Sequence, residues 1–183
     1  ALPFYVRLYV PKLRQRLEAG NLGSGSGTFS TRDIAEDYLN RITGDVKLAR
    51  PMKIAVDCGN GVAGAFAPEL YRRLGCQVTE LFCEVDGTFP NHHPDPSVMK
   101  NLEDLKRALA KGDEELGLAF DGDGDRLGVV TRDGQVIFPD RQLMLFAADV
   151  LSRNPGASVI FDVKCTRNLA PWIEKHGGKP VMW

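Results

Sequence analysis

The chain has 183 residues, of which 43% are apolar, enough for the core of one ordinary domain or of parts of two, and this composition excludes a disordered chain. Its formal net charge is −1, with Lys and Arg scattered among Asp and Glu, so the sequence lacks the basic stripe that binds nucleic acid. No apolar run reaches the length of a membrane span and the first residues lack the order of a signal peptide, so we expect a cytoplasmic protein without a membrane partner.

The amino-terminal residues differ in pattern from the rest of the chain. Residues 1–10 form an aromatic, alternating run, and Leu13 and Leu17 with charged neighbours predict a short helix after it. The glycine-serine run at residues 23–27 is typical of a surface linker or domain boundary, because such a run has no preferred backbone conformation.

From residue 31 onward, strands and helices alternate. Residues 31–42 carry apolar side chains at helical spacing, with Ser30 or Thr31 placed to cap this helix and Gly44 to end it. Short apolar runs predict strands at residues 53–56, 78–83, 116–120, 127–131, 136–138, 159–163 and 180–183. Helices are expected between them, at residues 63–74, 101–111, 140–152 and 166–176.

This order of elements defines the fold class. Short apolar strands followed by helices are typical of a sheet that is covered on both faces, so the class is α/β. Arg132, Asp133 and Gly134 form a tight turn between two strands and predict an antiparallel hairpin. We therefore expect a mixed β-sheet layered with helices.

The four cysteines show neither a paired metal-ligand spacing nor the density of a disulfide scaffold. We interpret them as reduced, mostly small core residues. They are Cys58, Cys76, Cys83 and Cys165.

The residues after the predicted strand 116–120 carry the clearest chemistry. Asp121, Asp123 and Asp125 alternate with glycines, which let the backbone bend so that three carboxylates can converge. Ligands gather at the carboxyl ends of strands in α/β sheets, and converging carboxylates repel one another unless a cation lies among them. Oxygen ligands favour a hard ion such as Mg²⁺, and Arg126 can bind a phosphate beside it.

Other interpretations of these and nearby residues compete with a metal site. A generic Asp-Gly turn needs no ligand, but three alternating Asp followed by Arg favour a metal site. An EF-hand is excluded, because its sixth position would be Arg126 rather than Gly and its twelfth Arg132 rather than Glu. His92 and His93 lie in a Pro-rich loop and are interpreted as structural rather than catalytic or metal-binding. Residues 59–61 could hold an anion at a helix start, although a tight turn is the favoured role.

Four stretches of sequence resemble a known family. Residues 117–126, Gly-Leu-Ala-Phe-Asp-Gly-Asp-Gly-Asp-Arg, resemble the metal loop of the α-D-phosphohexomutases, which interconvert the 1- and 6-phosphates of hexoses. Three more resemble the bacterial phosphomannomutase/phosphoglucomutase branch: residues 56–64 (Val-Asp-Cys-Gly-Asn-Gly-Val-Ala-Gly), 89–96 (Phe-Pro-Asn-His-His-Pro-Asp-Pro) and 161–167 (Phe-Asp-Val-Lys-Cys-Thr-Arg). The resemblance runs collinearly from about residue 13 to residue 183.

The resemblance implies a four-domain enzyme of which this sequence covers part. Residues 1–30 would be the remnant of the preceding domain and a linker, although residues 1–11 do not resemble the family. Residues 31–134 would be the second domain, which carries the metal loop, and residues 135–183 the first half of the third.

The implied activity is that of an isomerase working by a phosphoryl relay. A phosphoserine donates its phosphate to the sugar phosphate, giving a hexose 1,6-bisphosphate that turns around and returns the other phosphate. The three loop aspartates are expected to hold Mg²⁺, Arg126 to stabilise the travelling phosphate, and Lys164 to reach the substrate. Without the resemblance, Lys164 would be interpreted as a solvated surface residue. The implied partners are mannose and glucose 1- and 6-phosphates, and the full enzyme is expected to be a monomer.

The family's phosphoserine loop, Ser-His-Asn-Pro, is absent, since no serine in the chain is followed by His. Two functions therefore stay open: a segment of a hexose-phosphate mutase that is inactive alone, or a metal- and phosphate-binding module without turnover. A third candidate, a phosphatase with an aspartyl nucleophile, also begins at a strand-end Asp-x-Asp. It is disfavoured, because trapping a phosphoaspartate on Asp121 should fail if serine is the donor.

Overall fold

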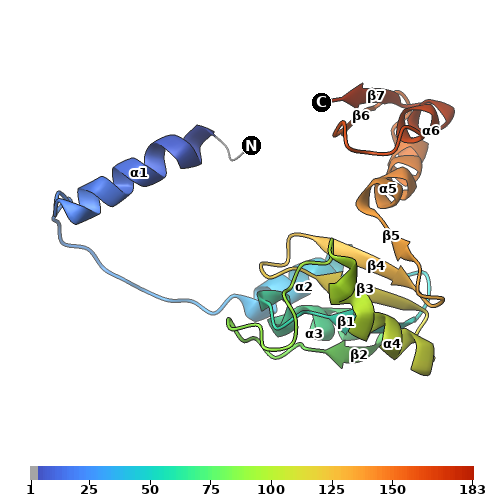
Figure 1. Ribbon diagram of the computed structural model, residues 1–183, viewed down its shortest axis with the longest axis horizontal. Coiled ribbons are helices and arrows are strands. Elements are labelled where there is room, and N and C mark those ends of the chain that lie inside the picture. The colour runs from blue at the N-terminus through green and yellow to red at the C-terminus, as the bar shows by residue number, and fades with distance from the viewer. Residues whose placement is uncertain (1–3) are drawn as a thin grey trace. The chain divides into compact units, whose positions relative to one another are not determined.

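The computed structural model describes residues 4–183 and divides into two units, residues 1–33 and 34–183. In the first unit, the helix predicted after the aromatic run begins within that run instead. Helix α1 spans Phe4–Glu18 and continues through Pro11 (Figure 1). The described residues offer this run no strand partner, so its backbone hydrogen bonds are made locally in a helix. Residues 21–33 have no regular structure, as the glycine-serine run predicts.

The second unit contains a five-stranded sheet in the order β2-β1-β3-β4-β5 (Figure 1). Strand β1 is parallel to β2 and β3, whereas β4 is antiparallel to β3 and β5, so the predicted mixed sheet and hairpin are confirmed. Gly134, with φ of 81°, forms the hairpin turn. The strands are β1 (Lys53–Asp57), β2 (Gln77–Leu81), β3 (Leu116–Phe120), β4 (Leu127–Thr131) and β5 (Val136–Ile137).

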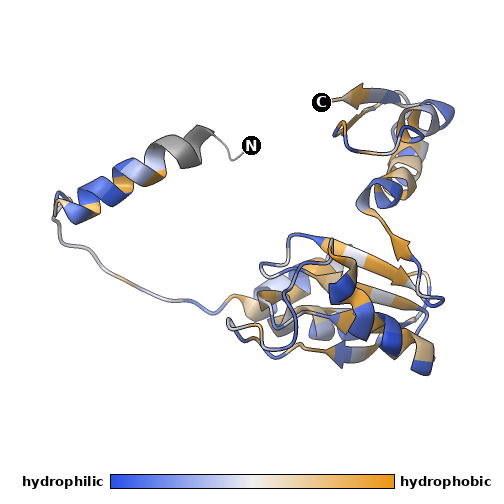
Figure 2. Ribbon diagram, viewed as in Figure 1, coloured by the Kyte–Doolittle hydropathy of each residue, from blue (hydrophilic) through white to orange (hydrophobic). Residues whose placement is uncertain are grey.

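Alternate residues of the central strands face two apolar layers. Ile54 and Val56 pack in one layer with Ala67 of α3 (Ala67–Arg73). Ala55 packs in the other with Leu105 of α4 (Glu103–Lys111). Helices therefore cover both faces, and the strands between them are predominantly apolar in Figure 2. The α/β fold class is confirmed.

The start and end predicted for the first helix of this unit are wrong. Helix α2 (Ala35–Asp45) begins after Ile34, which makes no side-chain capping hydrogen bond, and it contains Gly44. Ser30 and Thr31 lie before it and do not cap it. The acidic residues of its first turn, Glu36 and Asp37, favour this start because they complement the positive end of the helix dipole.

Other predicted boundaries shift where the backbone changes conformation. Strand β2 ends before Phe82, whose φ of 50° is incompatible with an extended strand. The helix predicted at residues 63–74 is interrupted at Phe66, because Pro68 starts a new helix, and the short 3-10 turn η1 (Val62–Ala65) precedes the break. A second 3-10 turn, η2 (Met99–Leu102), precedes α4.

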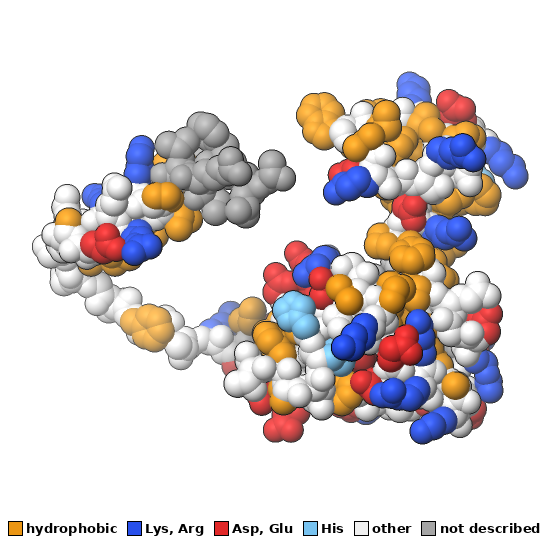
Figure 3. All heavy atoms as spheres, in the orientation of Figure 1, with side chains coloured by type: hydrophobic (Ala, Val, Ile, Leu, Met, Phe, Trp, Pro, Cys, Tyr) orange, Lys and Arg blue, Asp and Glu red, His pale blue; other side chains and the backbone are white. Residues whose placement is uncertain are grey.

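The carboxyl-terminal residues form a smaller sheet with its own core. Strands β6 (Ser158–Phe161) and β7 (Lys179–Met182) are parallel. Helices α5 (Pro139–Arg153) and α6 (Leu169–Lys175) contribute the buried residues Ala147, Leu151, Leu169 and Ile173. None of the described helices is long and apolar enough to cross a membrane. On the face of the second unit shown in Figure 3, acidic and basic side chains are intermixed.

Candidate metal centre

The hairpin between β3 and β4 carries the three predicted metal ligands. β3 ends at Phe120, and β4 begins at Leu127 directly opposite it, so the intervening loop is tight. Gly124 adopts a φ of 74°, and its N–H donates to the carbonyl of Asp121 at 3.2 Å. This turn brings one carboxylate oxygen from each loop aspartate within 4.8 Å of the others; the three residues are Asp121, Asp123 and Asp125.

Asp121 is the fixed member of the cluster, because its side chain is fully buried and bound by Arg126. The Arg126 backbone N–H donates to Asp121 Oδ1 at 2.9 Å, and its guanidinium Nε donates to Oδ2 at 2.6 Å. Burial opposes ionisation of Asp121, but these two hydrogen bonds outweigh it and lower the pKa of that carboxyl. Asp121 is therefore held as a carboxylate.

The two exposed aspartates carry the unbalanced charge of the cluster. Repulsion from Asp123, and then from Asp121, raises the pKa of the Asp125 carboxyl. A cation among the three oxygens would remove this repulsion, and a set made only of carboxylates suits Mg²⁺, Mn²⁺ or Ca²⁺. The residues present thus fit a hard divalent ion.

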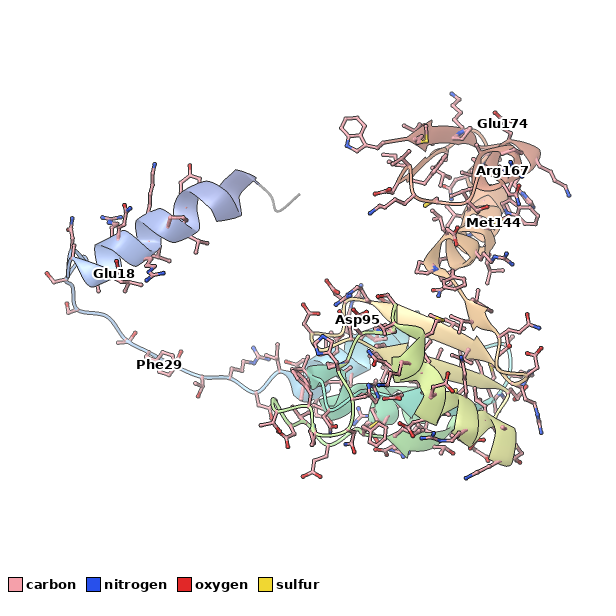
Figure 4. The ribbon with its side chains drawn as sticks, viewed as in Figure 1. Glu18, Phe29, Asp95, Met144, Arg167 and Glu174 are labelled. Carbon is pink, nitrogen blue, oxygen red and sulfur yellow. The ribbon has the colours of Figure 1, made fainter. Side chains whose placement is uncertain are left out.

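An aspartate outside the metal loop also pairs with Arg126, from the loop between β2 and η2. Asp95, labelled in Figure 4, lies 3.3 Å from Arg126 Nη1. The hydroxyl and backbone N–H of Ser97 both donate to Asp95 and lower the pKa of its carboxyl. The sequence pattern predicted no role for Asp95; the available signal was its place within residues 89–96, which resemble the family.

The turn after β1 packs against the backbone of the metal loop. Gly59 and Asn60 both adopt left-handed conformations, which makes residues 59–61 the tight turn that the sequence favoured over an anion site. A Cβ on Gly61 would come within 2.9 Å of the Gly122 carbonyl oxygen, so a larger residue here would push the two backbone segments apart. The Val62 N–H donates to the same carbonyl at 3.1 Å.

His92 has a structural partner that sequence reasoning missed. Its Nε2 lies 3.2 Å from both carboxylate oxygens of Asp57, the buried last residue of β1. Burial raises the pKa of Asp57, while His92 and the Gly59 N–H oppose that shift. Within the part of the chain that the structure describes, neither His92 nor His93 belongs to the aspartate cluster. The signal in the sequence for this pair was Asp57, an aspartate at the end of a predicted apolar strand.

Lys164 follows β6 and is not brought to the aspartate cluster through any contact among the described residues. Its ammonium lies 3.4 Å from Asp162 of its own loop, and 84% of its side chain is exposed. It is therefore a solvent-exposed cation on a surface loop in this structure.

Two mainly apolar cavities border the metal loop. One, of about 430 Å³, includes Phe66 and Asp123 in its lining. The other, of about 440 Å³, includes Arg126 and Phe138. The loop thus places three carboxylates that could hold a cation, and the guanidinium of Arg126, next to concave surfaces, an arrangement suited to a phosphorylated ligand.

Comparison with known proteins identifies the family. The model of "Phosphoglucomutase/phosphomannomutase, alpha/beta/alpha domain II" matches residues 36–134. The chain is 69% identical to a phosphoglucomutase of Neisseria meningitidis over 156 residues, covering 85% of this chain and 34% of the relative. It is 58% identical to a phosphomannomutase/phosphoglucomutase of Pseudomonas aeruginosa over 174 residues, covering 95% of this chain and 38% of the relative.

A solved structure supports the same family. A phosphoglucomutase/phosphomannomutase family protein of Burkholderia thailandensis superposes with a TM-score of 0.89 at 57% identity, over 95% of this chain and 38% of that one. The chain spans about a third of the length of the curated relatives it matches. It belongs to the phosphoglucomutase/phosphomannomutase family.

Proposed function

We propose that this chain supplies the Mg²⁺-binding and phosphate-binding loop of a phosphohexomutase, an isomerase that interconverts hexose 1-phosphates and hexose 6-phosphates. The observation that carries the proposal is the approach of Asp121, Asp123 and Asp125 within 4.8 Å at a strand end. The names of the relatives support mannose and glucose phosphates as substrates. A relay through a phosphoserine and a hexose 1,6-bisphosphate is part of the same proposal.

The acidic residues of the site would bind the metal ion, and the basic residues would bind phosphate. Mg²⁺ held by the three aspartates would supply positive charge that positions and polarises a phosphate. Arg126 is oriented by Asp121 and Asp95, while 58% of its side chain stays exposed, so its remaining N–H groups can bind a phosphate oxygen. Lys164, exposed after β6, would bind the substrate as a second cation.

Magnesium binding tests the proposal directly. Calorimetry on the chain should show weak Mg²⁺ binding that inorganic phosphate tightens. Asp123→Asn should weaken it about tenfold or more, because the ion loses a charged ligand. Asp149→Asn, which changes an exposed aspartate on α5, is the matched control and should bind as the wild type does. Unchanged affinity in Asp121→Asn, Asp123→Asn and Asp125→Asn alike would refute the site.

A second candidate is a metal- and phosphate-binding module without turnover of its own. The absence of any Ser-His pair in this sequence favours it for the isolated chain. The pure chain should therefore not convert mannose 1-phosphate to mannose 6-phosphate, even with added hexose 1,6-bisphosphate. Magnesium-dependent conversion would show that another residue accepts the phosphate.

A further inference from the structure

Two thiols meet beside the turn that supports the metal loop. Cys58 follows β1 and is fully buried, whereas Cys83, just beyond the end of β2, is partly exposed. Their Sγ atoms are 3.4 Å apart. β1 and β2 are parallel neighbours, and the Cys58 N–H donates to the Leu81 carbonyl at 3.1 Å, so the sheet itself holds the two cysteines together.

We propose that Cys58 and Cys83 form a reversible disulfide, in which Cys83 meets the oxidant and Cys58 closes the bond. A disulfide requires Sγ atoms about 2.05 Å apart. The two Sγ atoms, now 3.4 Å apart, therefore need to approach by about 1.4 Å. The other two cysteines lack such a partner among the described contacts. Cys76 packs in the core beside α3, and Cys165 lies in the carboxyl-terminal core.

The environment assigns different roles to the two thiols. The hydrogen bond between them lowers the pKa of Cys83, whereas the same bond, followed by burial, raises the pKa of Cys58. The thiolate is the reactive form of cysteine, and Cys83 is also the accessible one. Cys83 is therefore the attacking thiol, and Cys58 is the resolving thiol.

The reaction balances with a low-molecular-weight disulfide as the oxidant. The Cys83 thiolate attacks one sulfur of the oxidant and displaces the other as a thiolate, which leaves a mixed disulfide on Cys83. Cys58 transfers its proton to the released thiolate, attacks Cys83 Sγ and displaces the second thiolate. The second thiolate takes from solvent the proton that Cys83 had released, so the two cysteines lose two electrons and the oxidant is reduced to two thiols.

Closure of this bond would reach the metal loop through backbone contacts. The carbonyl oxygen of Cys83 lies 2.0 Å from the position of a Cβ on Gly64, so there is no free space between these segments. Gly64 belongs to η1, whose Val62 N–H binds the Gly122 carbonyl. A displacement of Cys83 would therefore move η1 and, through it, the metal loop. Weaker Mg²⁺ binding in the oxidised chain is the expected consequence, and this step rests on the proposed function.

Thiol mapping tests the disulfide independently of any metal. Treatment of the folded chain with glutathione disulfide should remove two of the four free cysteines, with loss of the mass of two hydrogen atoms, and a reducing agent should restore both. Cleavage after Lys, Arg and Glu places each cysteine on its own peptide, so a Cys58–Cys83 crosslink can be identified. Cys165→Ser should leave the crosslink unchanged, whereas Cys83→Ser, or Cys83→Ala if serine impairs folding, should abolish it.

The outcomes separate the two proposals. Glutathione that stays on Cys83, or that reacts first with Cys76 or Cys165, would overturn the disulfide. Calorimetry should show several-fold weaker Mg²⁺ binding in the oxidised wild type and no change on oxidant treatment of Cys83→Ser. Equal binding in crosslinked and reduced chains would overturn the coupling. Failure of both forms to bind Mg²⁺ would overturn the proposed function and leave the disulfide standing.

Discussion

β3 and β6 both end beside an aspartate that accepts a backbone N–H from a basic residue of the same loop. Asp121 accepts the Arg126 N–H at 2.9 Å, and Asp162 accepts the Lys164 N–H at 2.7 Å. The Asp121 side chain is fully buried, whereas 52% of the Asp162 side chain is exposed. Both aspartates thus accept a similar local hydrogen bond, but one carboxylate is buried and the other is exposed, and the difference lies in what packs around each loop.

The surroundings explain this difference. The metal loop is packed against the turn at residues 59–61 and against Pro94, whose Cγ lies 3.3 Å from the Cβ position of Gly122. The loop after β6 carries Lys164 outward into solvent, where its only described ion pair is with Asp162. The first loop is therefore held by packing from neighbouring segments, whereas the side chains of the second are exposed to solvent.

The largest expected effect comes from the two cores beneath these loops. Leu105 packs on Gly117 of β3, and Ile173 packs in the separate core around α6; both side chains are fully buried. Leu105→Ala and Ile173→Ala should each lower the free energy of unfolding of their own region by about 3 kcal/mol, because each leaves a cavity. Hydrogen exchange should show faster opening of β3 in the first variant and of β6 in the second.

Magnesium binding shows which of the two cores the metal loop depends on. Calorimetry should show that Ile173→Ala retains Mg²⁺ affinity at temperatures where Leu105→Ala has lost it. Equal loss in both variants would mean that the two regions unfold as one cooperative unit, and the comparison between the loops would then not reflect separate cores.

The buried carboxylate predicts the next largest effect. Asp121→Asn should lower the free energy of unfolding by about 2 kcal/mol, because hydrogen bonds to a charged group are weakened in a buried setting. Asp162→Asn is the matched control in the exposed loop and should change stability by less than about 0.5 kcal/mol. Urea denaturation measures both values. Similar values for the two variants would show that burial does not distinguish the loops.

Close backbone packing predicts a smaller effect. Gly61→Ala places a methyl group within 2.9 Å of the Gly122 carbonyl oxygen, so it should cost about 1 kcal/mol of stability and displace the metal loop. Gly87→Ala is the control, because nothing lies within 4 Å of its Cβ position and its φ is not in the left-handed region. Thermal denaturation and Mg²⁺ titration should both change in the first variant alone; a neutral Gly61→Ala would mean that the two turns separate freely.

Features that depend on neighbouring residues were predictable from the sequence. β3 and β4 have the predicted bounds, since short apolar runs end at the loop aspartates and resume after Arg126. Contacts across segments were not predictable, because linear spacing does not determine which loops meet above a sheet. Asp95 reaches Arg126 from 31 positions away, and His92 reaches Asp57 from 35. The roles of the loop aspartates in metal binding remain predictions of the sequence and the geometry together.

The smallest expected effect lies at the opposite end of β3, where Glu115 precedes the strand. Arg50 binds both carboxylate oxygens of Glu115, at 2.9 and 2.5 Å, and the guanidinium, followed by the Lys53 N–H, lowers the pKa of Glu115 from 4.5 to about 2. Because the pKa is lower in the folded chain than in the unfolded one, this carboxylate stabilises the fold above pH 4.5, and its contribution is lost as the pH falls through about 2. Glu115→Gln should therefore be less stable than the wild type at neutral pH, by a small amount that salt reduces further, since both side chains are partly exposed. The difference should shrink between pH 4.5 and 2 in urea denaturation, and Arg50→Gln should show the same trend. A difference that stays constant over this range would mean that the ion pair does not form in solution, so that β3 is fixed by charge only at the end that carries Asp121.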